Sequence, residues 1–245
     1  WVYSTLYFEK AFCFVVFCEQ VSIYIITNIN ISPIKGSYMK KLFSILLVAM
    51  LLPFAVNAAD QWKEGTHYNV ISEKATAKPE VTEFFSFWCP ACYRFEPLVK
   101  KMKEGLGEDV TFNKVQVNFM QSAGPSVQDD ATKAMIIGRA MKNEEALNAS
   151  IFNYIHEQRS TVTGLKDLRS VFIINGVDPE EFDKLAKSFS VKSLVNKNNR
   201  EIDTYRKHLT GVPNFIVNGK YQATFSRDMT PDDIVNLIVW LTKQP

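Results

Sequence analysis

The strongest pattern in the sequence is Val81-Thr82-Glu83-Phe84-Phe85-Ser86-Phe87-Trp88-Cys89-Pro90-Ala91-Cys92. Its first seven residues are β-forming and almost continuously apolar, which is typical of a strand buried on both faces of a sheet. The strand leads directly into Cys89 and Cys92. Behind the cysteines, apolar residues recur at helical spacing from Phe95 to Met102, and glycines end the pattern. The order of strand, cysteine pair and helix is therefore evidence for both the fold and the function.

The two cysteines have the arrangement that disulfide exchange requires. A thiolate attacks disulfides, so a redox cysteine needs a lowered pKa. The predicted position of Cys89 at the start of a helix supplies this, because free backbone N–H groups and the helix dipole favour negative charge there. Pro90 fits the first helical turn without loss of a hydrogen bond. We therefore predict that Cys89 is the exposed, attacking sulfur and that Cys92, one turn deeper, is its resolving partner.

Zinc binding is the alternative interpretation of this Cys-x-x-Cys spacing. A structural zinc site needs two further ligands. Outside the first 58 residues, the other histidines and cysteines are His67, His156 and His208, which are scattered without a second pair. We therefore predict no metal site, and we expect His156 and His208 to be surface residues of helices.

The sequence after the first helix predicts one more strand and then a long helical region. Val110–Phe119 has strand character, and no convincing strand follows before Gly211. Helices are expected over about 126–141, 144–158 and 165–175, and two more are expected to begin at Asp178 and at Ser190, with Phe189 in the apolar pattern of the first of them. This is more material than a crossover between two strands needs. It indicates an inserted helical domain.

Strand character returns near the end of the chain. Asn214–Val217 and Tyr221–Phe225 flank Asn218-Gly219, a type I′ hairpin signal, and a final helix follows Thr230. The predicted fold class is therefore α/β, a thioredoxin-like fold with an inserted α-helical domain. We assign residues 59–124 and 191–245 to the thioredoxin-like domain and residues 125–190 to the helical insert.

The first 58 residues have the features of processing rather than of a folded domain. Met39 precedes two lysines, an apolar stretch and a small-residue end before Ala59, which together resemble a secretory signal peptide at 39–58. A retained membrane anchor is the alternative, but the stretch is short and contains Pro53. We expect residues 1–38 to be an upstream extension ahead of the true start, so Cys13 and Cys18 receive no role.

Charge and cysteine content narrow the function of the remaining chain. Residues 59–245 carry 24 basic and 24 acidic side chains, because four of the 28 lysines and arginines and two of the 26 acids precede them. A balanced charge is not the footprint of a nucleic-acid binder. The two cysteines of residues 59–245 are too close in sequence for their disulfide to remove much entropy from the unfolded chain. A catalytic role therefore explains the cysteine pair better than stabilisation of the fold does.

The sequence resembles the DsbA family of bacterial periplasmic disulfide oxidases over essentially the whole chain after the signal peptide. The resemblance rests on Glu83–Tyr93, Val117-Asn118-Phe119-Met120, Val191–Val195, Gly211-Val212-Pro213 and Val217–Tyr221, in the family's order and spacing.

The resemblance implies several properties that the residues alone do not establish. It implies a cis bond between Val212 and Pro213, facing the cysteines, with the Val212 backbone available to an extended substrate. It also implies that Glu83 and Lys114 form a proton-relaying pair beneath the disulfide. The position of Glu83 in an apolar strand supports a partner, whereas Lys114 fits a solvent-facing position equally well. Finally, it implies reoxidation by a DsbB-type membrane quinone reductase.

One residue departs from the family pattern. The usual motif has histidine between proline and the second cysteine, and this chain has Ala91. Alanine offers neither the charge nor the hydrogen bond with which histidine stabilises a thiolate. We therefore expect a less acidic Cys89 and a weaker oxidant than in relatives that have the histidine.

The expected function is donation of the Cys89–Cys92 disulfide to exported, folding proteins with free cysteines, by a periplasmic monomer that needs no other cofactor. Trp88, beside the motif, either contacts substrate or packs at the strand end. Two alternatives remain. One is a reductase or isomerase kept reduced, and the other is a peptide-binding chaperone in which the cysteines are incidental.

Overall fold

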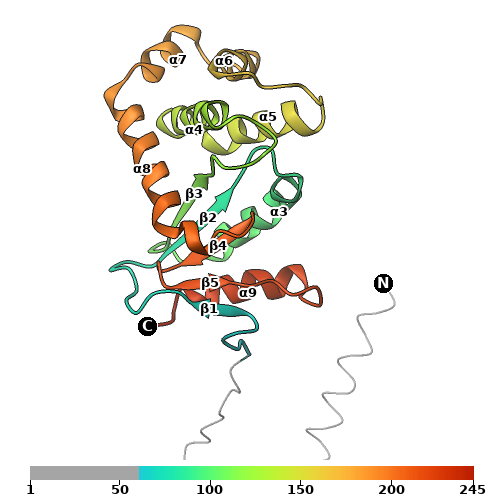
Figure 1. Cartoon of the computed structure of the whole chain (residues 1–245), viewed down its shortest axis with the longest axis vertical. Coiled ribbons are helices and arrows are strands. Elements are labelled where there is room, and N and C mark those ends of the chain that lie inside the picture. The colour runs from blue at the N-terminus through green and yellow to red at the C-terminus, as the bar shows by residue number, and fades with distance from the viewer. Residues whose placement is uncertain (1–60) are drawn as a thin grey trace, which may run out of the picture. The chain divides into compact units, whose positions relative to one another are not determined.

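A mixed five-stranded sheet lies at the centre of the structure (Figure 1). The computed structural model describes residues 61–245, so the predicted signal peptide, the upstream segment, Cys13 and Cys18 lie outside the described residues. β2 and β3 are parallel, and the other neighbours are antiparallel. From edge to edge the order is β1 (Tyr68–Val70), β5 (Tyr221–Ala223), β4 (Asn214–Val217), β2 (Glu80–Phe85) and β3 (Thr111–Gln116).

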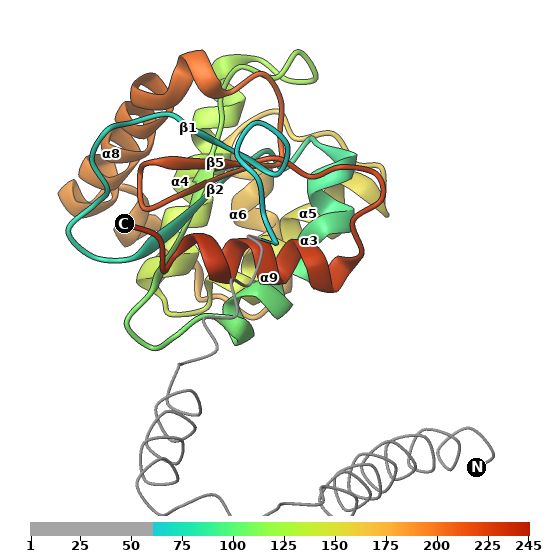
Figure 2. The same ribbon diagram turned by 90° about the horizontal axis from the view of Figure 1, so that it is seen from below.

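The central strand β2 is buried on both faces, as its sequence predicts. Val81 points into a cluster with Met102 of α3 (Pro90–Gly105) and Leu237 of α9 (Pro231–Leu241). Phe84 points the other way, into a cluster with Ile202 of α8 (Phe189–Tyr205). Figure 2 shows α9 and α8 on opposite sides of the strands. Because side chains alternate along a strand, Glu83 shares the face of Val81, toward α3.

The helical insert follows β3 and packs onto the segment that carries the cysteines. Phe85 and Phe87 belong to one cluster with Met135, Ile151 and Phe152 of the insert. The insert comprises α4 (Pro125–Ala140), α5 (Glu144–His156), α6 (Leu165–Ile174), α7 (Pro179–Ala186) and the start of α8.

Among the described residues no helix is both long and apolar enough to cross a bilayer.

The start of α8 corrects one prediction. Ser188, and not Ser190, is the N-cap, and its hydroxyl accepts a hydrogen bond from the Val191 N–H. Phe189 is the first residue of α8 and is 84% exposed, so its assignment to the apolar face of the preceding helix is wrong. Two nearby serines offered the same capping chemistry, and only the path of the chain after α7 selects between them.

Three strands are shorter than predicted and one was missed. β2 ends at Phe85, two residues before the end of the predicted strand. β3 covers Thr111–Gln116 of the predicted 110–119, and β5 ends at Ala223. β1 has three residues, which lie at the sheet edge beside β5. An edge strand this short carries too little alternation for a sequence signal. The predicted turn is present, since Asn218 and Gly219 have φ of 52° and 62°, as a type I′ hairpin requires.

The helix α8 spans the predicted boundary between residues 190 and 191. Its Val191 lies in the core of the helical insert, whereas Ile202 lies against the sheet. A single helix thus packs against both parts and connects the insert to the sheet that carries the cysteines.

Candidate active site

The cysteines lie where the strand–helix junction predicts them. Cys89 is the N-cap of α3, and its Sγ accepts a hydrogen bond from the Cys92 N–H at 3.0 Å. Both are free thiols in this structure. Cys89 is 4% exposed and Cys92 is completely buried. The prediction that Cys89 is exposed is therefore wrong, because the segments packed around the start of α3 cover it, although Cys89 is the less buried of the two.

The environment separates the pKa values of the two thiols. A hydrogen bond from the Cys92 thiol lowers the pKa of Cys89 to about 6, helped by the Cys92 and Ala91 N–H groups and by the charge of Arg94, against the effect of burial. The same thiol–thiol hydrogen bond, together with burial, raises the pKa of Cys92 above its ordinary value. Hence Cys89 is the thiolate and Cys92 keeps its proton.

The bond between Val212 and Pro213 is cis, as the resemblance implies. The loop that contains it faces Cys89, whose Sγ lies 3.4 Å from the Val212 carbonyl oxygen. Pro90 occupies the first turn of α3, and Ala91 beside it is exposed. Two sequence-distant segments therefore meet at the attacking sulfur.

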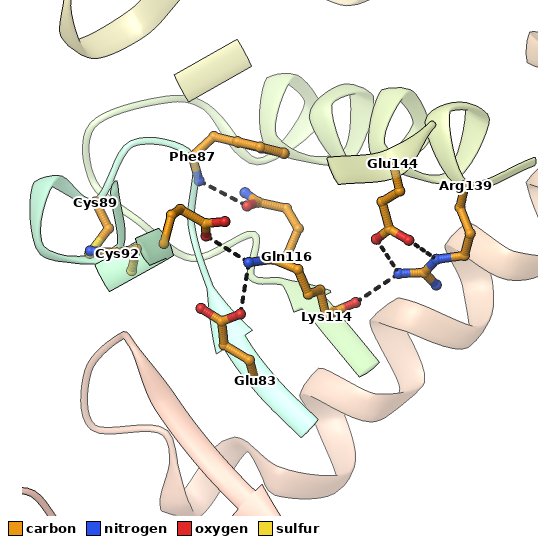
Figure 3. A network of polar contacts seen from close by, with 9 residues as sticks. Glu83, Phe87, Cys89, Cys92, Lys114, Gln116, Arg139 and Glu144 are labelled. Carbon is orange, nitrogen blue, oxygen red and sulfur yellow. Dashed lines mark hydrogen bonds and ion pairs between the residues drawn. The ribbon is translucent and has the colours of Figure 1, made fainter. Parts of the chain in front are cut away.

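A buried ion cluster lies behind the cysteines (Figure 3). Glu83 is completely buried on β2, and Lys114 opposite it on β3 is 6% exposed. The Lys114 Nζ lies 2.8 Å from Glu83 Oε2 and 2.6 Å from Glu96 Oε1 of α3. Burial raises the pKa of Glu83, and Lys114 only partly opposes this. The two carboxylates raise the pKa of Lys114 despite its burial, so Lys114 is the charged member and Glu83 the one that binds a proton readily.

The sequence did not indicate four residues that hold this site in place. Glu96 completes the Lys114 cluster, and Gln116 Oε1 accepts from the Phe87 N–H at 3.0 Å. Arg139 of α4 donates to the Lys114 carbonyl at 3.3 Å and pairs with Glu144 (Figure 3). His156 contacts the Phe87 carbonyl. For Gln116 alone the sequence held a signal that could have been used, which is a polar residue within a largely apolar strand.

Three further predictions have mixed outcomes. Trp88 is partly buried and packs against the cluster that contains Cys89, so its packing role is present and a substrate contact stays a prediction. His156 is partly buried against the loop that carries Cys89, so its predicted surface role is wrong. Within residues 61–245, no group of three or more His, Cys, Asp or Glu side chains is placed to hold a metal ion.

The sequence matches one protein-family model. Residues 80–234 fit the DSBA-like thioredoxin domain. Among curated proteins, the thiol:disulfide interchange protein DsbA of Escherichia coli K12 is 36% identical over 187 residues, which is 75% of this chain and 86% of the relative. The protein of the same name from Haemophilus influenzae is 32% identical over 84% of this chain and 98% of its own length.

Solved structures of similar proteins have the same fold. The disulfide oxidoreductase DsbA from Proteus mirabilis aligns with a TM-score of 0.66 at 26% identity, over 75% of this chain and 98% of that one. A variant of the Proteus mirabilis protein with a non-covalently bound peptide aligns with a TM-score of 0.65 at 26% identity, over 75% and 99% of the two chains. Sequence and structure thus point to the same family.

Proposed function

The chain belongs to the DsbA-like thioredoxin family and is a thiol:disulfide oxidoreductase, and from that premise we propose that it donates its Cys89–Cys92 disulfide to newly exported proteins. The observation that carries the proposal is the contrast between the two sulfurs. Cys89 is the N-cap of α3 and has a pKa of about 6, whereas Cys92 is completely buried and has a raised pKa.

The reaction proceeds in two exchanges. A substrate thiolate attacks Cys89 Sγ, the Cys89–Cys92 bond breaks, and Cys92 leaves and takes a proton, for which its raised pKa suits it. In this proposal Glu83 and Lys114 relay that proton, and their buried ion pair at 2.8 Å supports the role. A second substrate thiolate then attacks the substrate sulfur of the mixed disulfide, and Cys89 leaves as a thiolate. The substrate loses two electrons and the enzyme gains them.

The low pKa of Cys89 favours a donor over a reductase or isomerase. A stable thiolate stabilises the reduced enzyme, and a stable reduced form makes the disulfide a better oxidant. It also makes Cys89 a good leaving group in the second exchange. The hydrogen bonds from Cys92 and Ala91 to Cys89 therefore drive transfer toward the substrate.

The proposed setting follows from the same chemistry. Substrates are exported proteins with free cysteines, which is consistent with the bound peptide in the structure of one relative. In this proposal an extended segment of such a substrate binds along the Val212 backbone, whose carbonyl lies 3.4 Å from Cys89 Sγ. The enzyme acts in the periplasm as a monomer, with no cofactor besides its disulfide, and a DsbB-type membrane quinone reductase reoxidises it.

Direct transfer of the disulfide tests the proposal. Oxidised protein mixed with an equimolar, reduced and unfolded protein containing two cysteines should form the substrate disulfide while Cys89 and Cys92 become reduced. Thiol alkylation followed by mass spectrometry counts the thiols on both proteins. No transfer would contradict the proposal. If Cys89→Ser retained full activity in promoting folding, a peptide-binding chaperone would explain the protein better.

The pKa of Cys89 predicts a pH-dependent stability of the reduced form. The thiol has an ordinary pKa of 9.0 and about 6 when folded. A depressed folded pKa gives stability that is fully present above pH 9.0 and is lost as the pH falls to about 6. At pH 7 it contributes about 1.4 kcal/mol. The free energy of unfolding of the reduced form, minus that of the oxidised form, should therefore rise across this range. Denaturant unfolding measures it, and a constant difference would contradict the assignment.

Replacing Ala91 with histidine tests the departure from the family motif. Ala91 is exposed beside the Cys89 thiolate, so the imidazole of Ala91→His can add a positive charge and a hydrogen-bond donor there. We expect a lower Cys89 pKa and a more oxidising disulfide, by about tenfold in the equilibrium constant with glutathione for one pKa unit. Thiolate absorbance during a pH titration gives the pKa. A Cys89 that is equally or more acidic in the natural protein would refute the prediction.

A further inference from the structure

The peptide groups of Phe87 lie beyond the reach of the sheet. The last ladder bond of β2 at this end joins the Val117 N–H to the Phe85 carbonyl at 2.8 Å. Phe87 is completely buried two residues later. Its backbone N–H and C=O therefore need partners that are not strand neighbours, since buried peptide groups are costly when unpaired.

Two side chains from different elements provide these partners. Gln116 of β3 accepts from the Phe87 N–H (Figure 3), and the His156 Nε2 lies 2.8 Å from the Phe87 carbonyl oxygen. A carbonyl only accepts, so Nε2 must carry the proton. His156 meets this condition as the Nε2–H tautomer and also as the imidazolium. The adjoining turn is closed by Trp88 N–H to Ser86 Oγ and by Cys89 N–H to the Ser86 carbonyl.

The same histidine also contacts the far side of the cysteine motif. Its ring stacks on Tyr93, the residue after Cys92, with centroids 5.1 Å apart and planes at 3°. The Tyr93 hydroxyl is hydrogen-bonded to Glu157, which raises the pKa of Tyr93. His156 is the last residue of α5, so the end of this insert helix holds residues on both sides of the motif.

We infer that His156 is a positioning residue for Cys89. Through the Phe87 carbonyl and Tyr93 it fixes the turn and the start of α3, and so keeps Cys89 Sγ in line with the Cys92 N–H. The inference deepens the proposed function and rests on it. It gives the helical insert a role in the chemistry, because the end of α5 holds the backbone on both sides of Cys89.

Two substitutions separate the hydrogen bond from the ring contact. His156→Phe keeps an aromatic ring against Tyr93 and loses the donor, whereas His156→Gln keeps an N–H donor and loses the ring. We expect His156→Phe to raise the Cys89 pKa above about 6 and to slow mixed-disulfide formation by about tenfold. His156→Gln should recover most of both values. Thiolate absorbance and the rate of reaction with oxidised glutathione are the measurements.

His67→Phe is the matched control. The His67 side chain also accepts a hydrogen bond from the backbone, from the Lys63 N–H, and it has an aromatic contact with Trp62. This substitution should leave the Cys89 pKa and the rate unchanged. Hydrogen exchange should be faster at the amides of residues 86–89 in His156→Phe and unaltered there in His67→Phe.

The outcomes are distinct. If the natural protein fails to oxidise a substrate, the proposed function fails. If it succeeds and folded His156→Phe has the natural pKa and rate, this inference alone is overturned, as it is when His156→Gln is impaired as strongly as His156→Phe. Should His156→Phe not fold, nitrogen NMR of the natural protein decides: a His156 Nε2 without a proton at neutral pH overturns the inference, and a hydrogen-bonded Nε2–H with rescue in His156→Gln supports it.

Discussion

Cys92→Ala is expected to accumulate a stable mixed disulfide on Cys89, whereas Cys89→Ser forms none at a comparable rate. When oxidised glutathione is added to Cys92→Ala, the Cys89 thiolate attacks it and one reduced glutathione leaves. The adduct persists because the resolving thiol is gone. In Cys89→Ser the remaining Cys92 is completely buried, and although its hydrogen bond with the Cys89 thiol is lost, burial still raises its pKa. We therefore expect its reaction to be slower by about a hundredfold or more.

Intact mass and peptide mapping measure this asymmetry. Mapping is needed because Cys13 and Cys18 are also in the full chain. The natural protein is the control, and its adduct should be transient because Cys92 resolves it. An adduct on Cys92 that forms in Cys89→Ser as fast as the Cys89 adduct in Cys92→Ala would reverse the two roles. The asymmetry tests burial and pKa together, since either one alone would leave Cys92 partly reactive.

The local chemistry of the motif was predictable from the sequence, because it depends on neighbours in the chain. A buried strand leading into a helix places Cys89 at an N-cap whatever the rest of the fold does, and the structure has that geometry. The free-energy cost of burying the Glu83 carboxylate likewise indicated that it has a partner. Which partner it has was a matter of sheet register, which pairs Glu83 with Lys114 across parallel strands. Sequence spacing left open whether Lys114 faces solvent or Glu83, and the sheet register decides for Glu83.

The positioning residues could not be predicted, because their roles depend on distant segments. Glu96 occupies a helix position that suits solvent equally well, and only the packing of α3 over β3 brings it within 2.6 Å of Lys114. His156 lies 69 positions from Phe87 in the chain. No periodicity connects the end of an insert helix to a peptide group beyond a strand. The sequence thus predicts the reacting cysteines better than the residues that position them.

Lys114→Met is expected to destabilise the protein by about 3–5 kcal/mol at neutral pH, because it leaves Glu83 buried without its countercharge. Lys114 Nζ is the cation that lies 2.8 Å from the Glu83 carboxylate. The effect has a definite pH dependence. Burial raises the folded pKa of Glu83 above its ordinary value of 4.5, and loss of Lys114 raises it further. A raised carboxyl pKa favours folding at low pH, so the deficit is small below about pH 4.5 and grows as the pH rises toward the folded pKa.

A double-mutant cycle separates the buried charge from lost packing. Glu83→Gln in the Lys114→Met background removes the charge and should recover most of the lost free energy of unfolding, although Glu83→Gln alone leaves Lys114 paired with Glu96. Lys100→Met, on the exposed face of α3, is the matched control and should change stability by about 0.5 kcal/mol or less. Urea unfolding across the acid and neutral range measures the natural protein and all four variants. A Lys114→Met deficit that is small at neutral pH, or equal at every pH, would mean that Lys114 does not stabilise the charged form of Glu83 in the folded protein. The buried pair would then be no store of charge for the proton that Cys92 takes up, and the relay beneath the disulfide would need another donor.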